Sequence, residues 1–321
     1  LTPTAINRYM RCPLQFYYCY VENLREPDDD DDDTIDNRTF GNIFHTAAQL
    51  LYEKMTQQGK RILASDIDHV LKSGVDIERC VDEAFRQELF HLPVQGSAPT
   101  RQTPSVKPLP DLNGLQIINR EVIIHYLRQL LTIDRALTPF TILELEADVV
   151  QELYIPTIGI TTTIGGRIDR LDLVTDDEQG SPRERIRVID YKTGSRRLTP
   201  LKSVEAVFDP DQLRNHNDYY LQTLLYARLV TTDPHLKASF DTIPPVAPAL
   251  LFIQHTTGDD ANPILKFGNS RILDIASPDG DMFFDMLKEK VNQIFDPALD
   301  FTPTDNTDVC NNCPYASFCG R

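Results

Sequence analysis

The sequence lacks any long apolar run, and no stretch approaches the roughly 18 hydrophobic residues that a membrane-spanning helix needs. It also lacks the charged and apolar segments of a signal peptide, so secretion has no support and we expect a cytoplasmic protein. No internal repeat is visible, which argues against a repeat architecture. The chain begins at Leu1 without an initiator Met, and we expect it to be part of a longer protein.

Positive charge is scarce relative to negative charge. The chain of 321 residues has 32 Lys and Arg against 48 Asp and Glu, a formal net charge of −16. This balance disfavours a protein that coats nucleic acid by electrostatics alone. Hydrophobic residues make up 41% and charged residues 25%, which is ordinary for a folded protein and excludes disorder as the dominant state.

The charge is unevenly distributed along the chain. The segment 26–36 contains an unbroken run of acids from Asp28 to Asp33, whose mutual repulsion predicts a solvated loop. The segment 183–202 instead carries seven Lys and Arg residues against two acids. This basic strip could line a groove that follows phosphates, or its arginines could pair with surface acids; composition leaves both interpretations open.

Hydrophobic periodicity predicts a helical beginning, a central sheet and a helical end. The predicted helices are 39–55, 77–89, 115–136, 217–230 and 279–295. The predicted strands are 141–150, 151–155, 161–174, 186–191 and 249–254. Between them lie a Pro-rich loop at 93–111 and a hairpin loop at 176–183.

This order of elements predicts one α/β domain spanning residues 1–321, with a central mixed β-sheet flanked by helices. Its three parts are a mainly helical segment 1–138, a sheet-bearing core 139–256, and a C-terminal segment 257–321 that ends in a helix and a group of cysteines.

A strand that turns abruptly from apolar to charged contains the strongest chemical signal. Asp190 and Lys192 are two residues apart on it, so they share one face of the strand. Asp169, on the strand before the hairpin loop, can approach Asp190 if the register permits. Two inward carboxylates repel each other unless a cation lies between them, which predicts Mg²⁺ or Mn²⁺. Alternatively, Asp-x-Lys occurs by chance on many surface strands, and Asp169 with Arg170 could be an ordinary cross-strand ion pair.

Two helical motifs accompany this strand. Gly41 precedes His45 by one turn, and Gln222 precedes Tyr226 by the same spacing, so the members of each pair share a helix face. Alternatively, both pairs could serve only the packing of an amphipathic helix and have no role in a functional site. The chain order Gly-x3-His, Gly-x2-Asp, Asp-x-Lys and Gln-x3-Tyr resembles the RecB-type branch of the PD-(D/E)xK nuclease superfamily, over nearly the whole chain.

The resemblance implies a restriction-endonuclease-like fold and assigns roles to the motif residues. By this likeness the metal ligands are His45, Asp169, Asp190 and the main-chain carbonyl of Tyr191. Lys192 resembles the catalytic lysine, with Gln222 and Tyr226 as further members of the catalytic group. Glu144 or Glu146 is an additional acidic or structural member, and the resemblance does not choose between them.

Six cysteines lie mostly at the two ends of the chain. Cys12 is near the N-terminus, and Cys310, Cys313 and Cys319 form Cys-x2-Cys-x5-Cys at the C-terminus. Thiols spaced in this way suit either Zn²⁺ or an iron-sulfur cluster, and spacing does not separate the two. Cys19 and Cys80 have no partner at ligand spacing, so we interpret them as packed thiols, although Cys19 could substitute for a ligand.

Residues 2–13 and 310–319, which contain these four cysteines, look like the segments that hold a [4Fe-4S] cluster in AddB-like helicase-nuclease subunits. This likeness implies a structural cluster, or staple, that joins the N- and C-terminal segments.

The resemblance as a whole implies a metal-dependent DNA nuclease, acting as an exonuclease on single-stranded DNA or duplex ends in recombination and repair. Its expected partners are DNA and a helicase domain or subunit of the same complex. A different class remains as the alternative: a nuclease-like iron-sulfur scaffold or DNA-binding module with weak or no catalysis.

Overall fold

A computed structural model describes residues 1–24, 35–57, 59–92, 109–176, 183–194, 198–254 and 262–320, apart from the side chain of Arg214. Most of the acidic loop 26–36, most of the Pro-rich loop 93–111 and most of the hairpin loop 176–183 lie outside these residues.

A five-stranded sheet forms the centre of the described structure, in the order β1-β2-β3-β4-β5. The first four strands are antiparallel, whereas β5 runs parallel to β4, so the sheet is mixed, as predicted. The strands are β1 (Arg61–Ile62), β2 (Phe140–Ile155), β3 (Ile160–Asp176), β4 (Arg183–Lys192) and β5 (Val246–Phe252). A separate two-stranded sheet pairs β6 (Lys266–Phe267) with β7 (Ser270–Arg271).

Strand β2 differs from the sequence prediction of two strands, 141–150 and 151–155. It runs without a break because β3 pairs with it across the expected boundary, Val150 with Gly165 and Gln151 with Ile164. Gly165 has a φ of 141°, and a Cβ there would lie 2.0 Å from the Val149 carbonyl oxygen. Glycine at this position therefore permits the close approach of the two strands.

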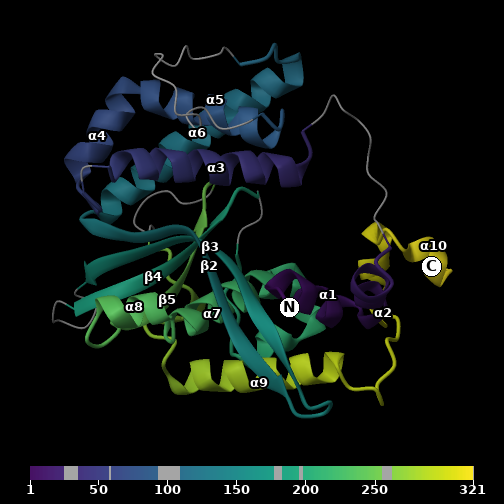
Figure 1. Ribbon diagram of the computed structural model, residues 1–321. Coiled ribbons are helices and arrows are strands. Elements are labelled where there is room, and N and C mark those ends of the chain that lie inside the picture. The colour runs from purple at the N-terminus through teal and green to yellow at the C-terminus, as the bar shows by residue number, and fades with distance from the viewer. Residues whose placement is uncertain are drawn as a thin grey trace.

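Four helices cover one face of the sheet, shown above it in Figure 1. They are α3 (Asn37–Met55), α4 (Ala64–Ser73), α5 (Val75–Glu88) and α6 (Gly114–Leu137). Asp36 caps α3 by accepting a hydrogen bond from the Thr39 N–H at 2.6 Å. The apolar faces of these helices form one core with Ile189 and Tyr191 of β4.

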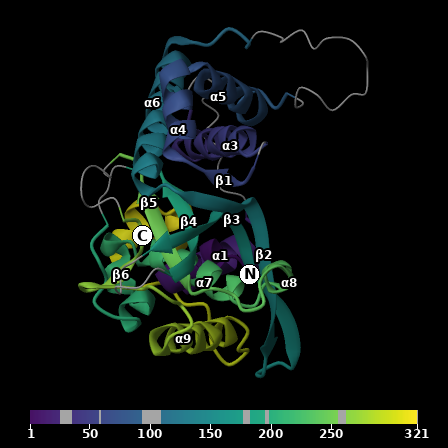
Figure 2. The ribbon, with the colours of Figure 1, turned by 90° about the vertical axis from the view of Figure 1, so that its left-hand side faces the viewer.

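The opposite face packs against α7 (Asn217–Val230) and α9 (Pro278–Ile294), visible below the sheet in Figures 1 and 2. Ile186 and Val188 of β4 point into this second core, since side chains alternate along a strand. The other elements on this side are α1 (Pro3–Arg11), α8 (Pro234–Ser239), and two 3₁₀ segments, Glu205–Phe208 and Pro210–Asn215. Helices α1, α4 and α8 were not predicted, because nine, ten and six residues are too few for a clear period.

Residues 13–24 lie beside the C-terminal residues 302–319 (Figure 1). The N-terminal end comprises α2 (Pro13–Phe16) and a π-helical turn, Tyr17–Val21; the C-terminal end comprises a 3₁₀ segment, Thr307–Asn312, and α10 (Ala316–Cys319). Tyr315 Oη donates to the Leu24 carbonyl at 2.8 Å, and the Leu14 N–H donates to the Thr302 carbonyl at 3.1 Å. Ring contacts between Phe16 and Phe301 add apolar packing.

Burial interrupts the described part of the predicted basic strip. Arg185 and Arg187 are both buried, and Arg187 donates two hydrogen bonds to Asp172 at 2.8 Å. Arg187 thus pairs with a buried acid, as a buried guanidinium requires, whereas Arg185 donates to the Leu273 backbone carbonyl. Arg196 and Arg197 lie outside the described residues.

Among the described helices, none combines the length with the apolar character that crossing a bilayer requires.

Candidate active site

Two acidic residues face each other on neighbouring strands. The register that pairs Arg170 with Ile189 places Asp169 opposite Asp190 one residue further on. Asp169 Oδ2 accepts a hydrogen bond from the backbone N–H of Tyr191 at 2.7 Å, which ties the middle of β3 to the end of β4. Arg170 points to the other face of the sheet, so it is not the cross-strand partner of Asp169.

Lys192 shares the face of Asp190, as period-two geometry predicts. Its Nζ lies 2.7 Å from Asp190 Oδ2. Gln222 on α7 contacts both groups: its Nε2 donates to Asp190 Oδ1 at 2.9 Å, and its Oε1 lies 3.4 Å from Lys192 Nζ. One side-chain amide therefore holds the acid and the lysine in a fixed relation.

Burial and charge shift the pKa values of this group. Burial raises the pKa of Asp190 to about 6, although Lys192 opposes the shift. Burial lowers the pKa of Lys192, but the attraction of Asp190 outweighs burial and raises it overall. Lys192 is therefore protonated at neutral pH, which suits charge balance at a reacting phosphate rather than abstraction of a proton.

His45 and Glu146 complete the acidic group from two other elements. His45 Nδ1, on α3, lies 3.3 Å from Asp169 Oδ2. One ligand atom from each of His45, Glu146 and Asp169 lies within 4.8 Å of the others, a spacing that could hold a metal ion. An imidazole and carboxylates are donors that suit Mn²⁺ and, through oxygen, Mg²⁺.

The same charges shift the pKa values of His45 and Glu146. Burial lowers the pKa of His45, but Asp169 outweighs burial and brings it up to about 9. Burial also raises the pKa of Glu146 to about 7, assisted by Asp169. A cation that binds beside these two groups near neutral pH would therefore displace protons from them.

The structure separates the two candidate glutamates. The β2–β3 register shifts by one residue between Ile142 and Glu144, and Glu146 itself has a φ of 47°. Glu144 pairs with Leu171 in the ladder, whereas Glu146 belongs to the group with His45 and Asp169. A bulge next to an active site commonly redirects a side chain in this way, and no sequence pattern marks it.

Tyr226 lies behind Gln222, against β3. It hydrogen-bonds with the Gln222 side chain and the Arg167 backbone, while burial raises its pKa. A Cβ on Gly166 would lie 2.6 Å from Tyr226 Oη, so glycine there leaves room for the phenol. The two motif residues therefore have different contacts. Gln222 contacts Asp190 and Lys192, and Tyr226 contacts Gln222.

Other predicted positions are placed as follows. The Tyr191 ring is buried 6.0 Å from the His45 ring, and its backbone lies beside Asp169. A Cβ at Gly41 would meet no described atom within 4 Å, so the space beside this backbone position is open.

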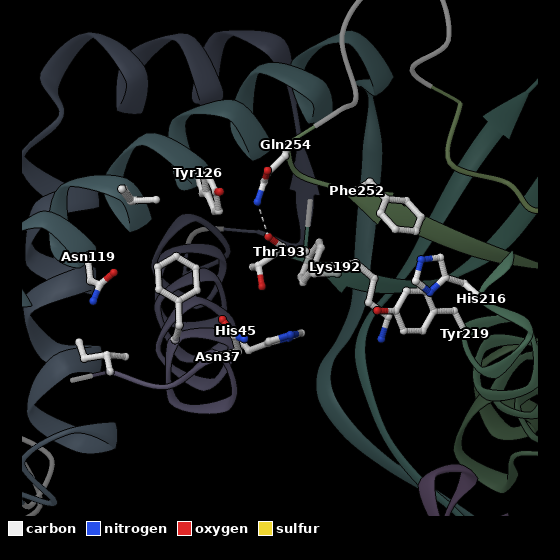
Figure 3. Close-up of a pocket in the computed structure, with 15 residues that line it drawn as sticks. Asn37, His45, Asn119, Tyr126, Lys192, Thr193, His216, Tyr219, Phe252 and Gln254 are labelled. Atoms are coloured by element: carbon white, nitrogen blue, oxygen red, sulfur yellow. Dashed lines mark hydrogen bonds between the residues drawn. The ribbon is translucent and has the colours of Figure 1, made fainter. Parts of the chain in front are cut away.

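An aromatic group beside Lys192 was not predicted. Lys192 Nζ lies 4.5 Å from the ring centre of Tyr219, and that ring stacks on His216 at 4.6 Å with an interplanar angle of 4°. Figure 3 shows both rings next to Lys192. Tyr219 precedes Gln222 by three residues on α7, and this spacing was the available signal.

The four predicted cysteine ligands come together at the joined ends of the chain. Cys12, Cys310, Cys313 and Cys319 line one cavity of about 20 Å³. Cys12 occupies the junction of α1 and α2, and Cys313 follows the 3₁₀ segment that contains Cys310. Cys19 contacts the Arg8 side chain instead, and Cys80 is buried in the α3–α6 core.

The mixed sheet and the helices α3 and α7 gather acids, a histidine and a lysine at one place, and three of these side chains have the spacing of a possible metal site. The family comparison is more specific: the family model of the PD-(D/E)XK nuclease superfamily matches residues 1–320, and the chain belongs to that superfamily. Members of the superfamily are nucleases, generally metal-dependent. A comparison with curated proteins found no match.

Proposed function

We propose that this chain is a divalent-metal-dependent deoxyribonuclease that hydrolyses phosphodiester bonds, acting as an exonuclease on single-stranded DNA or duplex ends. One observation carries the proposal: Asp169, Asp190 and Lys192 meet where the pairing of β3 with β4 ends, with His45 Nδ1 3.3 Å from Asp169 Oδ2. Membership of the nuclease superfamily supports it independently.

Mg²⁺ or Mn²⁺ is the proposed cofactor, held by His45, Asp169, Asp190 and the main-chain carbonyl of Tyr191. Glu146 joins this set because it shares the ligand spacing of His45 and Asp169. A cation bound there supplies an activated water and neutralises charge on the phosphate.

The remaining roles follow from the contacts of the chain's own residues. The Lys192 ammonium is placed to balance negative charge as water attacks phosphorus. Gln222 fixes Lys192 relative to Asp190, and Tyr226 holds Gln222. These contacts keep the ammonium from turning toward solvent, so it needs little reorganisation during the reaction.

We further propose that Cys12, Cys310, Cys313 and Cys319 hold a [4Fe-4S] cluster, with Zn²⁺ as the alternative. Their shared cavity and the hydrogen bonds joining the two chain ends support a structural staple. With the RecB-type motif order, this staple favours an AddB-like, cytoplasmic helicase-nuclease that processes DNA ends in recombination and repair. The net charge of −16 favours DNA affinity supplied by a helicase partner.

The test is cleavage of end-labelled single-stranded and duplex DNA by anaerobically purified protein with Mg²⁺ or Mn²⁺. Asp190→Asn and Lys192→Ala should each abolish cutting. Asp148→Asn on β2 and Lys288→Ala on α9 are matched controls, since both residues are solvent-exposed, and should cut normally. No cutting by folded, metal-loaded wild-type protein, at DNA concentrations that saturate binding without a partner, would refute the nuclease and favour the scaffold or DNA-binding alternative.

The cluster needs a separate measurement. Iron and acid-labile sulfide at about four atoms each per chain, lost in Cys313→Ser, are expected for [4Fe-4S]. Colourless protein that contains zinc would replace this assignment with a structural Zn²⁺ site.

A further inference from the structure

A cleft of about 710 Å³ opens beside the proposed catalytic residues. His45 and Lys192 both line it, and Figure 3 shows them between Asn119 and Tyr126 on one side and Tyr219 and Phe252 on the other. Its volume falls within the range of about 300 to 1,000 Å³ that is typical of ligand sites. Aromatic side chains from four separate elements line its walls: Phe40 of α3, Tyr126 of α6, Tyr219 of α7 and Phe252 of β5.

The polar lining of this cleft differs from the rest of the chain. The chain has 48 acidic residues, yet none of the described residues that line the cleft is Asp or Glu. The lining instead includes neutral polar side chains: Asn37, Asn119, Thr193 and Gln254. Amides and a hydroxyl can hydrogen-bond with the edges of a nucleobase, and the absence of carboxylates there avoids repelling a nearby phosphate.

The aromatic rings are not equivalent. His216 stacks on Tyr219, and Lys192 Nζ lies 4.5 Å from the centre of the same ring, so Tyr219 serves to position Lys192. Phe252 pairs with Lys192 in the parallel ladder and lies 6.1 Å from Tyr219, which places its ring next to the lysine. On the other wall, Phe40 and Tyr126 meet edge to face at 5.9 Å. Rings on two walls can hold a planar group between them.

We infer that this cleft is a subsite for an unpaired nucleobase adjacent to the phosphate that reacts at Lys192, with Phe252 and Tyr126 as its stacking residues. A base inside a duplex has both faces covered by its neighbours, so only a single strand or a frayed end can occupy the cleft. The inference rests on the proposed nuclease function and makes single-stranded DNA the preferred substrate.

The first test needs no variant. Binding of fluorescein-labelled dT12 is compared with that of an abasic 12-mer of equal charge, in Ca²⁺ so that DNA stays intact. We expect dT12 to bind about 5-fold to 150-fold more tightly, the range typical of one stacked base. A blunt duplex should also bind more weakly than dT12. Equal affinity for dT12 and the abasic strand, or for dT12 and the duplex, would overturn the inference.

The second test places the preference in the cleft. Phe252→Leu and Tyr126→Leu should each reduce the ratio of dT12 to abasic affinity and leave binding of the abasic strand unchanged. Tyr154→Leu, which replaces an exposed tyrosine on the β2–β3 hairpin, is the matched control and should keep the full ratio. Circular dichroism checks that each variant is folded. An unchanged ratio in both cleft variants would overturn the assignment, even if the wild-type protein cuts DNA. Conversely, a base preference without any cutting would refute the nuclease alone.

Discussion

Arg170 provides the sharpest test of how the site is supported. It follows Asp169 on β3 but points to the opposite face of the sheet, where it is completely buried. Its guanidinium donates two hydrogen bonds to Asp134 of α6, at 2.6 and 2.9 Å, and lies 3.3 Å from Asp172. The rings of Tyr52 and Phe140 each lie 5.1 Å from it. Arg170 therefore links the strand carrying Asp169 to the helical layer.

Replacing Arg170 by Met keeps most of the side-chain volume but removes the charge. Asp134, itself fully buried, then lacks its bidentate partner. Breaking a buried ion pair by removing one member costs about 3 to 5 kcal/mol of unfolding free energy, because the remaining charge is uncompensated. The control is Arg167→Met on the same strand, whose pair with Asp148 is mostly exposed. An exposed pair contributes about 0 to 1 kcal/mol.

Equilibrium denaturation in urea with EDTA measures the loss of unfolding free energy in both variants. Comparison of the slopes of unfolding free energy against urea concentration shows whether unfolding stays two-state. Adding Asp134→Asn to Arg170→Met should recover part of the loss, because the unpaired charge is removed. The reasoning holds that burial of the ion pair, and not pairing alone, sets the loss of unfolding free energy. Equal losses of unfolding free energy in Arg170→Met and Arg167→Met would refute it.

Three further predictions concern single side chains. His45 has a pKa of about 9 in the fold against about 6.5 unfolded, so it stabilises the metal-free protein fully below pH 6.5 and loses this effect as the pH rises to 9. The melting temperature in EDTA should fall across this window by an amount that His45→Gln reduces; an identical fall in the variant would contradict the assignment. Gly166→Ala should cost about 1 to 3 kcal/mol in denaturation because its Cβ crowds Tyr226 Oη, and adding Tyr226→Phe should relieve the crowding, whereas no relief would show that the cost arises elsewhere. Burial raises the pKa of Cys80 to about 11, so mass spectrometry should find it unalkylated by iodoacetamide at pH 8 in native protein and alkylated in urea; rapid native labelling would contradict this environment.

Much of the fold followed from local patterns. The long helices α3, α5, α6, α7 and α9 and the strands β3 and β4 were predicted because their apolar residues repeat at helix or strand spacing. Asp190 and Lys192 were placed on one face for the same reason, since neighbouring positions along a strand have fixed directions. The short helices and the unbroken course of β2 depend on contacts with other elements, and no local pattern reveals those.

What the sequence alone determined is the α/β class, the charge distribution and the order of the motifs, because each depends on residues close together in the chain. The tertiary structure alone decided which glutamate joins His45 and Asp169, since a one-residue register shift in β2 precedes Glu146. It also decided that Arg185 and Arg187 are buried rather than lining a groove, and that Tyr219 and Phe252 stand beside Lys192. These outcomes depend on strand register and on packing between distant segments, and a single sequence carries no direct record of either.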